Sequence, residues 1–311
     1  MCIRDRINLG SYVKVLSNKS LDPSNGFTVG ATIWPTNIEV NDQCIISQFN
    51  SSQDAGMALF VGPQGASVVV ADGKKNIIRL SIDKPVSERR WYHIWATFDL
   101  KSEKLGIYQT AVIDSFDLDS SLQKEIACST RPRPTPKQPL IIGAAGNKKI
   151  TNCFNGKIER PFFINDAVND KEALDIAKGS NDLRVTAVWD FSKNISSQNA
   201  LDISENKFHG KIINLPTRAV KGFLWDGICF DWTKKPEHYG AIHFHDDDLY
   251  DCCWETDFSF TVPKNFHSGV YAAKLATVEN YEEMIPFFVT PLATLNPILR
   301  ACGSLMIFGI R

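Results

Sequence analysis

The stretch Tyr239–Glu255, which reads YGAIHFHDDDLYDCCWE, concentrates groups that can bind a metal or transfer a proton. It holds two histidines, four aspartates, one glutamate, two tyrosines and two cysteines. Residues 241–245 alternate in a way that predicts a strand. Side chains two residues apart on a strand lie on the same side, about 7 Å from each other. His243, His245 and Asp247 therefore share one face if the strand continues that far.

Two interpretations of this stretch follow from the residue types. Two histidines and one carboxylate form a set that suits a divalent transition metal. Three consecutive aspartates are also typical of a solvated turn at the end of a strand, where carboxylates accept hydrogen bonds from nearby backbone amides, and this is the favoured interpretation. The candidates for supporting roles in catalysis are His243, His245, Asp246, Asp247, Asp248 and Glu255. None is assigned as a nucleophile, and no G-x-S-x-G motif or glycine-rich phosphate loop accompanies them.

Composition limits the class of protein. The chain has 311 residues, 43% hydrophobic and 22% charged, which is ordinary for a globular protein of about two domains. A formal net charge of −1 argues against nucleic acid or an anionic membrane as the main partner. No apolar run reaches the roughly 20 residues that span a bilayer, and the start lacks the apolar core of a secretory signal. We therefore expect a cytoplasmic protein.

Eight cysteines are scattered along the chain without a C-x-x-C pair or a zinc-site spacing. The sequence predicts free thiols in a reducing compartment. A disulfide between the adjacent Cys252 and Cys253 would be strained, so these two are also predicted to be free.

The first part of the chain predicts many short strands. Turn-forming residues such as Asn25-Gly26, Asp72-Gly73 and Asn155-Gly156 separate them, a pattern typical of an antiparallel sandwich. The strands are predicted at residues 12–16, 27–34, 44–49, 57–62, 67–71, 77–82, 92–98, 105–113, 140–142 and 157–164.

Three local features refine this picture. The strand that follows Trp91 is apolar on both faces, so it is predicted to be central and covered on its outer side, with His93 as a packed structural residue. The proline-rich segment Arg131–Lys137 predicts an extended loop. Asn169–Lys178 predicts a short helix that ends at Gly179.

These residues carry a resemblance to a known fold. The strings FTVGATIWPT, WYHIWATFDL, LIIGAAGN and NGKIERPFFINDAVNDKEALDIAKG resemble a concanavalin A-like, laminin G-type jelly roll over residues 7–180. The expected fold class is therefore mostly β, a jelly-roll sandwich followed by a smaller β-rich region. This fold hosts many functions, so it does not by itself indicate one.

Residues 183–289 resemble a second family. The strings HGKIINLPTRAVKGFLWDG, HFHDDDLYD and VPKNFHSGVYAAKL are similar to the large (β) subunit of N,N-dimethylformamidase. Residues 290–311 do not continue that resemblance and are expected to be an aberrant or truncated tail, with an apolar helix over residues 299–310. Met1–Arg6 resembles translated adapter sequence, so the natural protein is expected to begin further upstream.

The family resemblance implies an activity and its parts. It implies an amidohydrolase that converts small formamides to formate and an amine with a mononuclear iron held by tyrosine, histidine and glutamate. It places those ligands in a downstream domain, so the resemblance implies that this chain is the N-terminal part, binds no metal and is inactive alone. It also implies a downstream catalytic domain, a small subunit and a homo-oligomer as partners.

Two other functions stay open. The sandwich could bind a glycan or another ligand, for which Trp34 and Trp225 are possible platforms, although core packing is the favoured role for both. It could also be a structural module that docks to another subunit.

Overall fold

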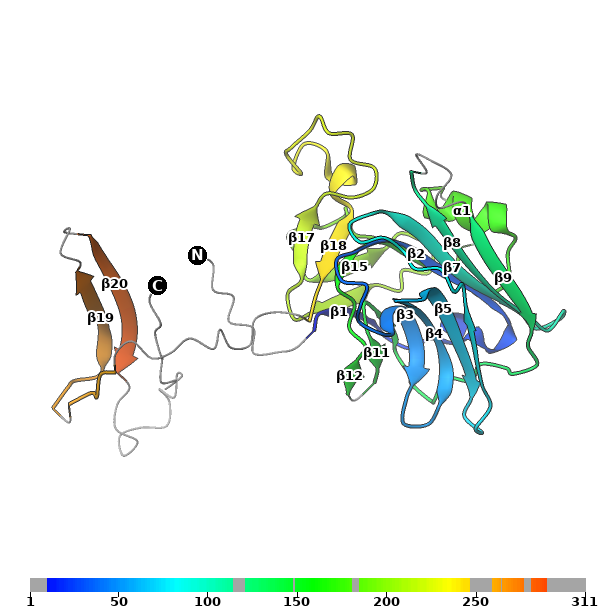
Figure 1. Cartoon of the computed structure of the whole chain (residues 1–311), viewed down its shortest axis with the longest axis horizontal. Helices are drawn as coiled ribbons and strands as arrows, with labels where there is room; N and C mark the ends of the chain where they lie inside the picture. Colours follow the sequence, from blue (N-terminus) through cyan, green and yellow to red (C-terminus); the bar gives the residue numbers. More distant parts are fainter. Residues whose placement is uncertain are drawn as a thin grey trace. The chain divides into compact units, whose positions relative to one another are not determined.

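The computed structural model describes residues 10–113, 121–147, 149–180, 185–246, 259–263, 265–276 and 281–289 (Figure 1). The chain divides into two compact units, Met1–Asp248 and Leu249–Arg311. The predicted tail, its helix over residues 299–310 and Met1–Arg6 lie outside the described residues, as do Cys252 and Cys253.

The first unit is an antiparallel β-sandwich. One layer follows the strand order β6-β5-β4-β3-β10-β1-β16, and the other follows β13-β2-β7-β8-β9. The first layer contains β1 (Tyr12–Val15), β3 (Gln43–Asn50), β4 (Ala55–Gly62), β5 (Gly65–Asp72), β6 (Ile77–Ser81), β10 (Leu140–Ile142) and β16 (Gly210–Ile213). The second contains β2 (Phe27–Pro35), β7 (Tyr92–Asp99), β8 (Lys104–Ala111), β9 (Leu122–Ala127) and β13 (Gly156–Ile164).

Strands from the second predicted region complete these layers. β14 (Ala187–Asp190) pairs with β13, and β15 (Asn199–Asp202) pairs with both β14 and β16, so the two strands join the layers along one side. β17 (Thr217–Val220) pairs with β18 (Ala241–Phe244), which in turn pairs with β13. Sequence analysis placed a boundary at residues 180–183, but strands on both sides of that position share the same layers.

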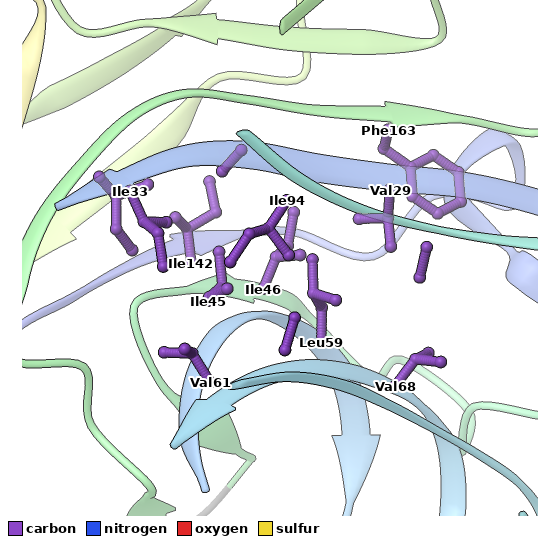
Figure 2. Packing of buried hydrophobic residues seen from close by; sticks show 14 of the residues in the cluster. Val29, Ile33, Ile45, Ile46, Leu59, Val61, Val68, Ile94, Ile142 and Phe163 are labelled. Atoms are coloured by element: carbon purple, nitrogen blue, oxygen red, sulfur yellow. The ribbon is translucent and has the colours of Figure 1, made fainter. Parts of the chain in front are cut away.

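The core lies between the two layers. Figure 2 shows apolar side chains from both layers pointing toward one another. Each fully buried side chain of this kind contributes about 1.5–3 kcal/mol relative to an exposed one. The labelled residues are Val29, Ile33, Ile94 and Phe163 from one layer and Ile45, Ile46, Leu59, Val61, Val68 and Ile142 from the other.

The central position predicted for the strand after Trp91 is confirmed. β7 pairs with β2 on one side and with β8 on the other. Tyr92 and Ile94 face the core between the layers, whereas Trp95 packs in a separate cluster on the outer face. β7 is apolar on both faces because each face packs against its own group of apolar side chains.

The predicted short helix is also confirmed. α1 (Asp170–Ala177) begins at the N-cap Asn169, whose side chain accepts a hydrogen bond from the Glu172 amide at 3.0 Å. Gly179, with a φ of +117°, follows the helix in a conformation that favours glycine. The buried face of α1 packs against Trp95 and Tyr108 on the outer face of the second layer.

Most predicted strands are found within two residues of their expected ends. β9 was not predicted, because three consecutive polar residues interrupt its sequence LQKEIA, which lies largely exposed at the end of its layer. The short pair β11 (Ala145–Gly146) and β12 (Ile150–Thr151) was also missed. The Arg131–Lys137 segment forms the predicted loop without helix or strand.

The second unit contributes one hairpin. β19 (Gly269–Ala276) pairs along its whole length with β20 (Glu282–Val289). Phe266 and Phe287 stack on Tyr271, with ring centroids at 4.9 Å and 5.7 Å.

Candidate functional site

The two histidines predicted to share a face lie close together. His243 is on β18, and His245 follows that strand directly. Their ring centroids are 6.0 Å apart with an interplanar angle of 67°, and both residues are half-buried. In the sheet register, His243 lies opposite Lys157 of β13 and Thr217 of β17.

The residues after β18 are held by hydrogen bonds to two distant segments. The Asn155 side chain donates to Asp246 Oδ1 at 2.8 Å, and the Asp246 amide donates to Asn155 Oδ1 at 3.0 Å. The Ser11 amide donates to the His245 carbonyl, and the His245 amide donates to the Ser11 hydroxyl, both at 3.2 Å. The Asn155 amide in turn donates to Gln43 Oε1 at 2.9 Å. Asp246 therefore connects the segment after β18 to the start of β13.

The remaining predicted site residues, Asp247, Asp248 and Glu255, lie outside the described residues. Among the residues that the structure does describe, no three His, Cys, Asp or Glu side chains are grouped closely enough to hold a metal ion. His243, His245 and Asp246 thus do not form a metal site by themselves, and the described residues do not fit a mononuclear iron centre.

Sequence analysis missed the most perturbed carboxyl group of the sandwich, that of Glu159. This residue of β13 is 4% exposed, and its Oε2 accepts a hydrogen bond from the Phe223 amide at 2.7 Å. A Cβ added at Gly222 would lie 2.4 Å from Oε2, and one at Gly240 would lie 2.8 Å from Oε1. Burial raises the pKa of Glu159 to about 8, against the lowering effect of the Phe223 hydrogen bond.

Glu159 anchors residues 221–240, which we call the covering segment. The Gly222 amide donates to the His238 carbonyl at 2.9 Å, which closes the base of the segment above Glu159. The only available signals for this arrangement were a glutamate inside an apolar strand and two glycines 18 residues apart. These glycines cannot be paired with Glu159 without the fold.

His93 is the packed structural residue that the sequence predicts. It is 2% exposed, its Nδ1 lies 2.8 Å from Thr32 Oγ1, and its ring meets Phe223 edge-on at 5.4 Å between centroids. Burial, with a smaller effect of Lys178, lowers the pKa of His93 to about 4. The imidazole therefore stays neutral at pH 7.

A lysine lies against two tryptophans beside this cluster. Lys157 Nζ is 4.3 Å from the Trp34 ring centroid and 5.8 Å from that of Trp91, and it donates to the Lys221 carbonyl at 3.3 Å. Burial, followed by the charge of Lys221, lowers the pKa of Lys157. Such cation–π contacts contribute about 0.5–2 kcal/mol.

The buried role favoured for Trp34 and Trp225 is wrong for both. Each tryptophan is half-buried and lies beneath a lysine ammonium group, which is 3.7 Å from the ring centroid at Trp225. Trp34 is near the end of β2 and Trp225 is in the covering segment, so neither lies between the two layers.

The covering segment has an organised interior and an apolar surface. Trp225 Nε1 and the Tyr239 hydroxyl both donate to the Cys229 carbonyl, at 3.0 Å and 2.9 Å. Four apolar side chains remain exposed: Leu224 by 48%, Ile228 by 79%, Phe230 by 70% and Trp232 by 39%. All four belong to one short stretch of the chain, residues 224–232.

The string NLPTRAV contains Arg218, whose side chain has a structural role. Arg218 donates to five backbone carbonyls of the turn at residues 191–199, the shortest contact being 2.7 Å to Phe191. The guanidinium group thereby fixes the connection between β14 and β15.

The thiols within the described part are free, as predicted. Cys44, Cys128 and Cys153 are buried, and Cys229 is half-buried. Burial raises the pKa of Cys44, Cys128 and Cys153, which keeps these thiols protonated and poorly nucleophilic at pH 7.

The residues with perturbed pKa values in the described site therefore have mainly structural roles. Glu159 and His93 are enclosed by strands and by the covering segment, so a substrate cannot reach them in this arrangement. The more accessible groups are His243, His245 and Lys157, which are half-buried along one side of β13 and β18.

Comparison with known proteins first defines the class. Residues 8–173, more than half of the chain, match the model of the concanavalin A-like lectin/glucanases superfamily, and the chain belongs to this superfamily. Solved structures with a similar fold include a protein from Bacteroides ovatus, with 17% identity, a TM-score of 0.46 and coverage of 66% of this chain and 59% of that chain. The LG1–3 region of the laminin alpha2 chain has 12% identity, a TM-score of 0.40 and coverage of 52% and 32%.

A more particular similarity covers nearly the whole chain. Residues 217–302 match the family model described as N,N-dimethylformamidase beta subunit-like, C-terminal, a match that includes the first residues of the predicted tail. The chain is 31% identical to the N,N-dimethylformamidase beta subunit of Alcaligenes sp. and 30% identical to that of Paracoccus aminophilus, in each case over 308 residues. Each alignment covers 92% of this chain and 40% of the relative, so the chain spans less than half the length of these relatives. The resemblance inferred from HFHDDDLYD and NLPTRAV is confirmed.

No helix among the described residues is long and apolar enough to cross a membrane.

Proposed function

We propose that this chain is the sandwich-bearing part of an amidohydrolase that cleaves small formamides such as N,N-dimethylformamide. In this reaction, the oxygen of water bonds to the carbonyl carbon and the carbon–nitrogen bond breaks. The amine leaves with a proton, and formate is the second product. The observation that carries the proposal is 31% identity to an N,N-dimethylformamidase beta subunit over 92% of the chain.

We assign the metal chemistry to a downstream domain of the longer polypeptide and not to this chain. The described residues contain no suitable cluster of ligands, and their perturbed groups, Glu159 and His93, are enclosed. We therefore assign the sandwich a supporting role, in which β18 and the covering segment position neighbouring parts of the enzyme. His243, His245 and Asp246 are the candidates for contacts with those neighbouring parts. None of the three is assigned a catalytic step.

The test compares the 311-residue chain with a polypeptide of the relatives' full length that carries it. Each is purified and assayed for dimethylamine and formate released from N,N-dimethylformamide, and its iron content is measured. We expect equimolar formate and amine from the longer polypeptide only, and substoichiometric iron in the 311-residue chain. Absence of both products from the iron-loaded longer polypeptide would overturn the assigned reaction. Stoichiometric iron in the short chain would overturn the assigned division of roles.

A second candidate function, docking to another subunit of the same enzyme, has its own supporting observation. Four large apolar side chains of the covering segment are exposed, namely Leu224, Ile228, Phe230 and Trp232. The relatives are described as beta subunits, and large apolar side chains that become buried on association are typical of subunit contacts. Co-purification of the longer polypeptide with its partner subunit should be weakened by Phe230→Ser and unchanged by Val40→Ser, which alters an apolar residue 41% exposed elsewhere. Equal recovery of both variants would exclude this surface.

A further inference from the structure

The hairpin of β19 and β20 has an outer edge on each strand. The two strands pair with each other, and no other strand among the described residues pairs with either of them. A two-stranded hairpin by itself is at best marginally stable in water, and a third strand or a packed layer is needed for a stable sheet. We therefore asked which edge of the hairpin can accept a further strand.

Pro286 of β20 determines which backbone groups of the hairpin point outward. It lies opposite Ala272 in a register that continues without a break on both sides. Opposite residues in an antiparallel pair alternate between pairs that exchange two backbone hydrogen bonds and pairs that exchange none. Because proline has no N–H, Ala272 and Pro286 exchange none. The same holds for every second pair, so the amides of Val270, Ala272 and Lys274 point away from β20.

The two outer edges differ as a result. The outer edge of β20 lacks an N–H at Pro286, and proline in an edge strand is a common protection against pairing with a further strand. β19, with the sequence GVYAAKLA, contains no proline, and its outer edge presents an unbroken row of N–H and C=O groups. A strand that joins the hairpin is therefore expected beside β19.

Both faces of the hairpin are apolar, which restricts the kind of partner. Phe260 and Phe266 pack against one face, with ring centroids 6.0 Å from Phe287 and 4.9 Å from Tyr271. The side chains of the other face are exposed. They include Val270 by 70%, Met284 by 54% and Phe288 by 62%.

Strands that are apolar on both faces are typical of sheets that are covered on both sides. A second copy of the hairpin, paired edge to edge, would extend the exposed apolar face without covering it. The partner must therefore supply a strand for the edge of β19 and apolar side chains for this face, which a folded domain can do.

The relatives contain enough polypeptide for such a partner. More than half of each N,N-dimethylformamidase beta subunit lies outside its alignment with this chain. The C-terminal family model, which matches residues 217–302, includes the whole hairpin. The hairpin thus lies in a region that this chain shares with proteins of more than twice its aligned length.

We propose that the outer edge of β19 pairs with a strand from the part of the longer polypeptide that lies outside this alignment. The exposed apolar face of the hairpin packs against the same added domain. Backbone hydrogen bonds along the edge hold the strand, and side chains that alternate along it contact the two faces. This proposal requires the longer polypeptide, but it does not depend on the assigned amidase reaction.

Hydrogen exchange at single amides tests the proposal without an activity measurement. The outward amides of Val270, Ala272 and Lys274 are compared in the 311-residue chain and in a polypeptide of the relatives' full length. We expect these amides to exchange about 100-fold more slowly in the longer polypeptide. The inward amides of Tyr271 and Ala273, which bond to β20, are the internal reference in both proteins.

Three results would overturn the proposal. Rapid exchange of the outward amides in both proteins would show that no strand pairs with this edge. Protection in the 311-residue chain that increases with protein concentration would assign the edge to a second copy. Protection in that chain at every concentration would assign the edge to another segment of the same chain.

Substitutions at Ala272 separate the edge from the hairpin itself. Ala272→Pro removes the outward N–H but no bond to β20, whereas Ala272→Ser keeps the N–H and is the matched control. In the longer polypeptide, Ala272→Pro should accelerate exchange at Val270 and Lys274 about tenfold or more, while Tyr271 stays protected. Unchanged exchange at Val270 and Lys274 would place the partner strand elsewhere. If Tyr271 also loses protection, the hairpin has opened, and the comparison of the two parent proteins decides.

Discussion

The Glu159 carboxyl group lies directly beneath the Phe223 backbone amide, which donates a 2.7 Å hydrogen bond to Oε2. This contact ties the covering segment to β13 at a position where Gly222 and Gly240 leave no space for a side chain. One buried acid therefore bonds to one end of the 20-residue covering segment and lies against the other end at Gly240.

The pH dependence of stability should report the ionisation of Glu159. Burial raises the pKa of Glu159 from 4.5 to about 8, so between these values the folded protein retains a proton that the unfolded chain releases. The free energy of unfolding is therefore highest below pH 4.5 for this group and falls as the pH rises toward 8. Each unit of pKa difference corresponds to about 1.4 kcal/mol.

Glu159→Gln should remove this fall. The amide keeps an acceptor for the Phe223 amide and carries no charge at any pH. Urea unfolding between pH 5 and 8.5 measures the slope, and Glu39→Gln, at an exposed position, is the control. Identical slopes in the parent protein and in Glu159→Gln would contradict a carboxyl group that stays protonated in the folded protein.

His93 should produce the opposite dependence. Burial lowers the pKa of His93 from 6.5 to about 4, so in this interval the unfolded chain binds a proton that the folded protein does not. The contribution of His93 to stability is complete above pH 6.5 and is lost as the pH falls toward 4. His93→Gln, which can still bond to Thr32, should reduce the loss. The control is His267→Gln in the hairpin unit, where the side chain is exposed. If the free energy of unfolding falls by the same amount between pH 7 and pH 4 in the parent protein and in His93→Gln, then His93 is protonated in the folded protein.

The sequence predicted the sandwich well, because its core strands alternate or are continuously apolar. For β7, which follows Trp91, the residue pattern alone indicated two buried faces. β9 could not be found in this way, since its apolar residues Leu122 and Ile126 are separated by three polar residues and are only partly buried against the core. Backbone pairing without apolar alternation leaves no periodic signal.

The site was predicted less completely, for a physical reason. His243 and His245 are neighbours in sequence, so their proximity follows from the strand period. Glu159 and its two glycines are separated by more than 60 residues, and only the pairing of β13 with β18 brings them together. Arg218 lies in a recognised string, but its five carbonyl partners belong to a turn that the string does not describe.

Replacing Arg218 by lysine should destabilise the folded protein. A single ammonium group cannot reproduce the fork that reaches carbonyls from Phe191 to Asn199. Arg218→Lys should lower the free energy of unfolding by about 2–3 kcal/mol, whereas Arg133→Lys at an exposed position should change it by less than about 0.5 kcal/mol. Hydrogen exchange of the amides at residues 191–199 should accelerate in the Arg218 variant only. Unchanged exchange there would show that the turn holds its shape without the guanidinium group.

Substitutions at Asn155 and Asp246 distinguish a structural role of Asp246 from a catalytic one. Asn155 is 1% exposed and uses both side-chain atoms on Asp246, so Asn155→Ala should cost about 1–3 kcal/mol by leaving buried groups without partners. Asp246→Asn keeps an oxygen that can accept from Asn155 Nδ2, so it should cost less than about 1 kcal/mol.

The decisive measurement for this pair combines stability with activity. In the relatives' full-length context, both variants are assayed for amine release well below their unfolding temperatures. A structural role for Asp246 predicts that Asp246→Asn retains activity, because the hydrogen bond survives the loss of charge. Loss of amine release in Asp246→Asn with unchanged stability would instead assign the Asp246 charge to the chemistry. That result would make the segment after β18 part of the active site.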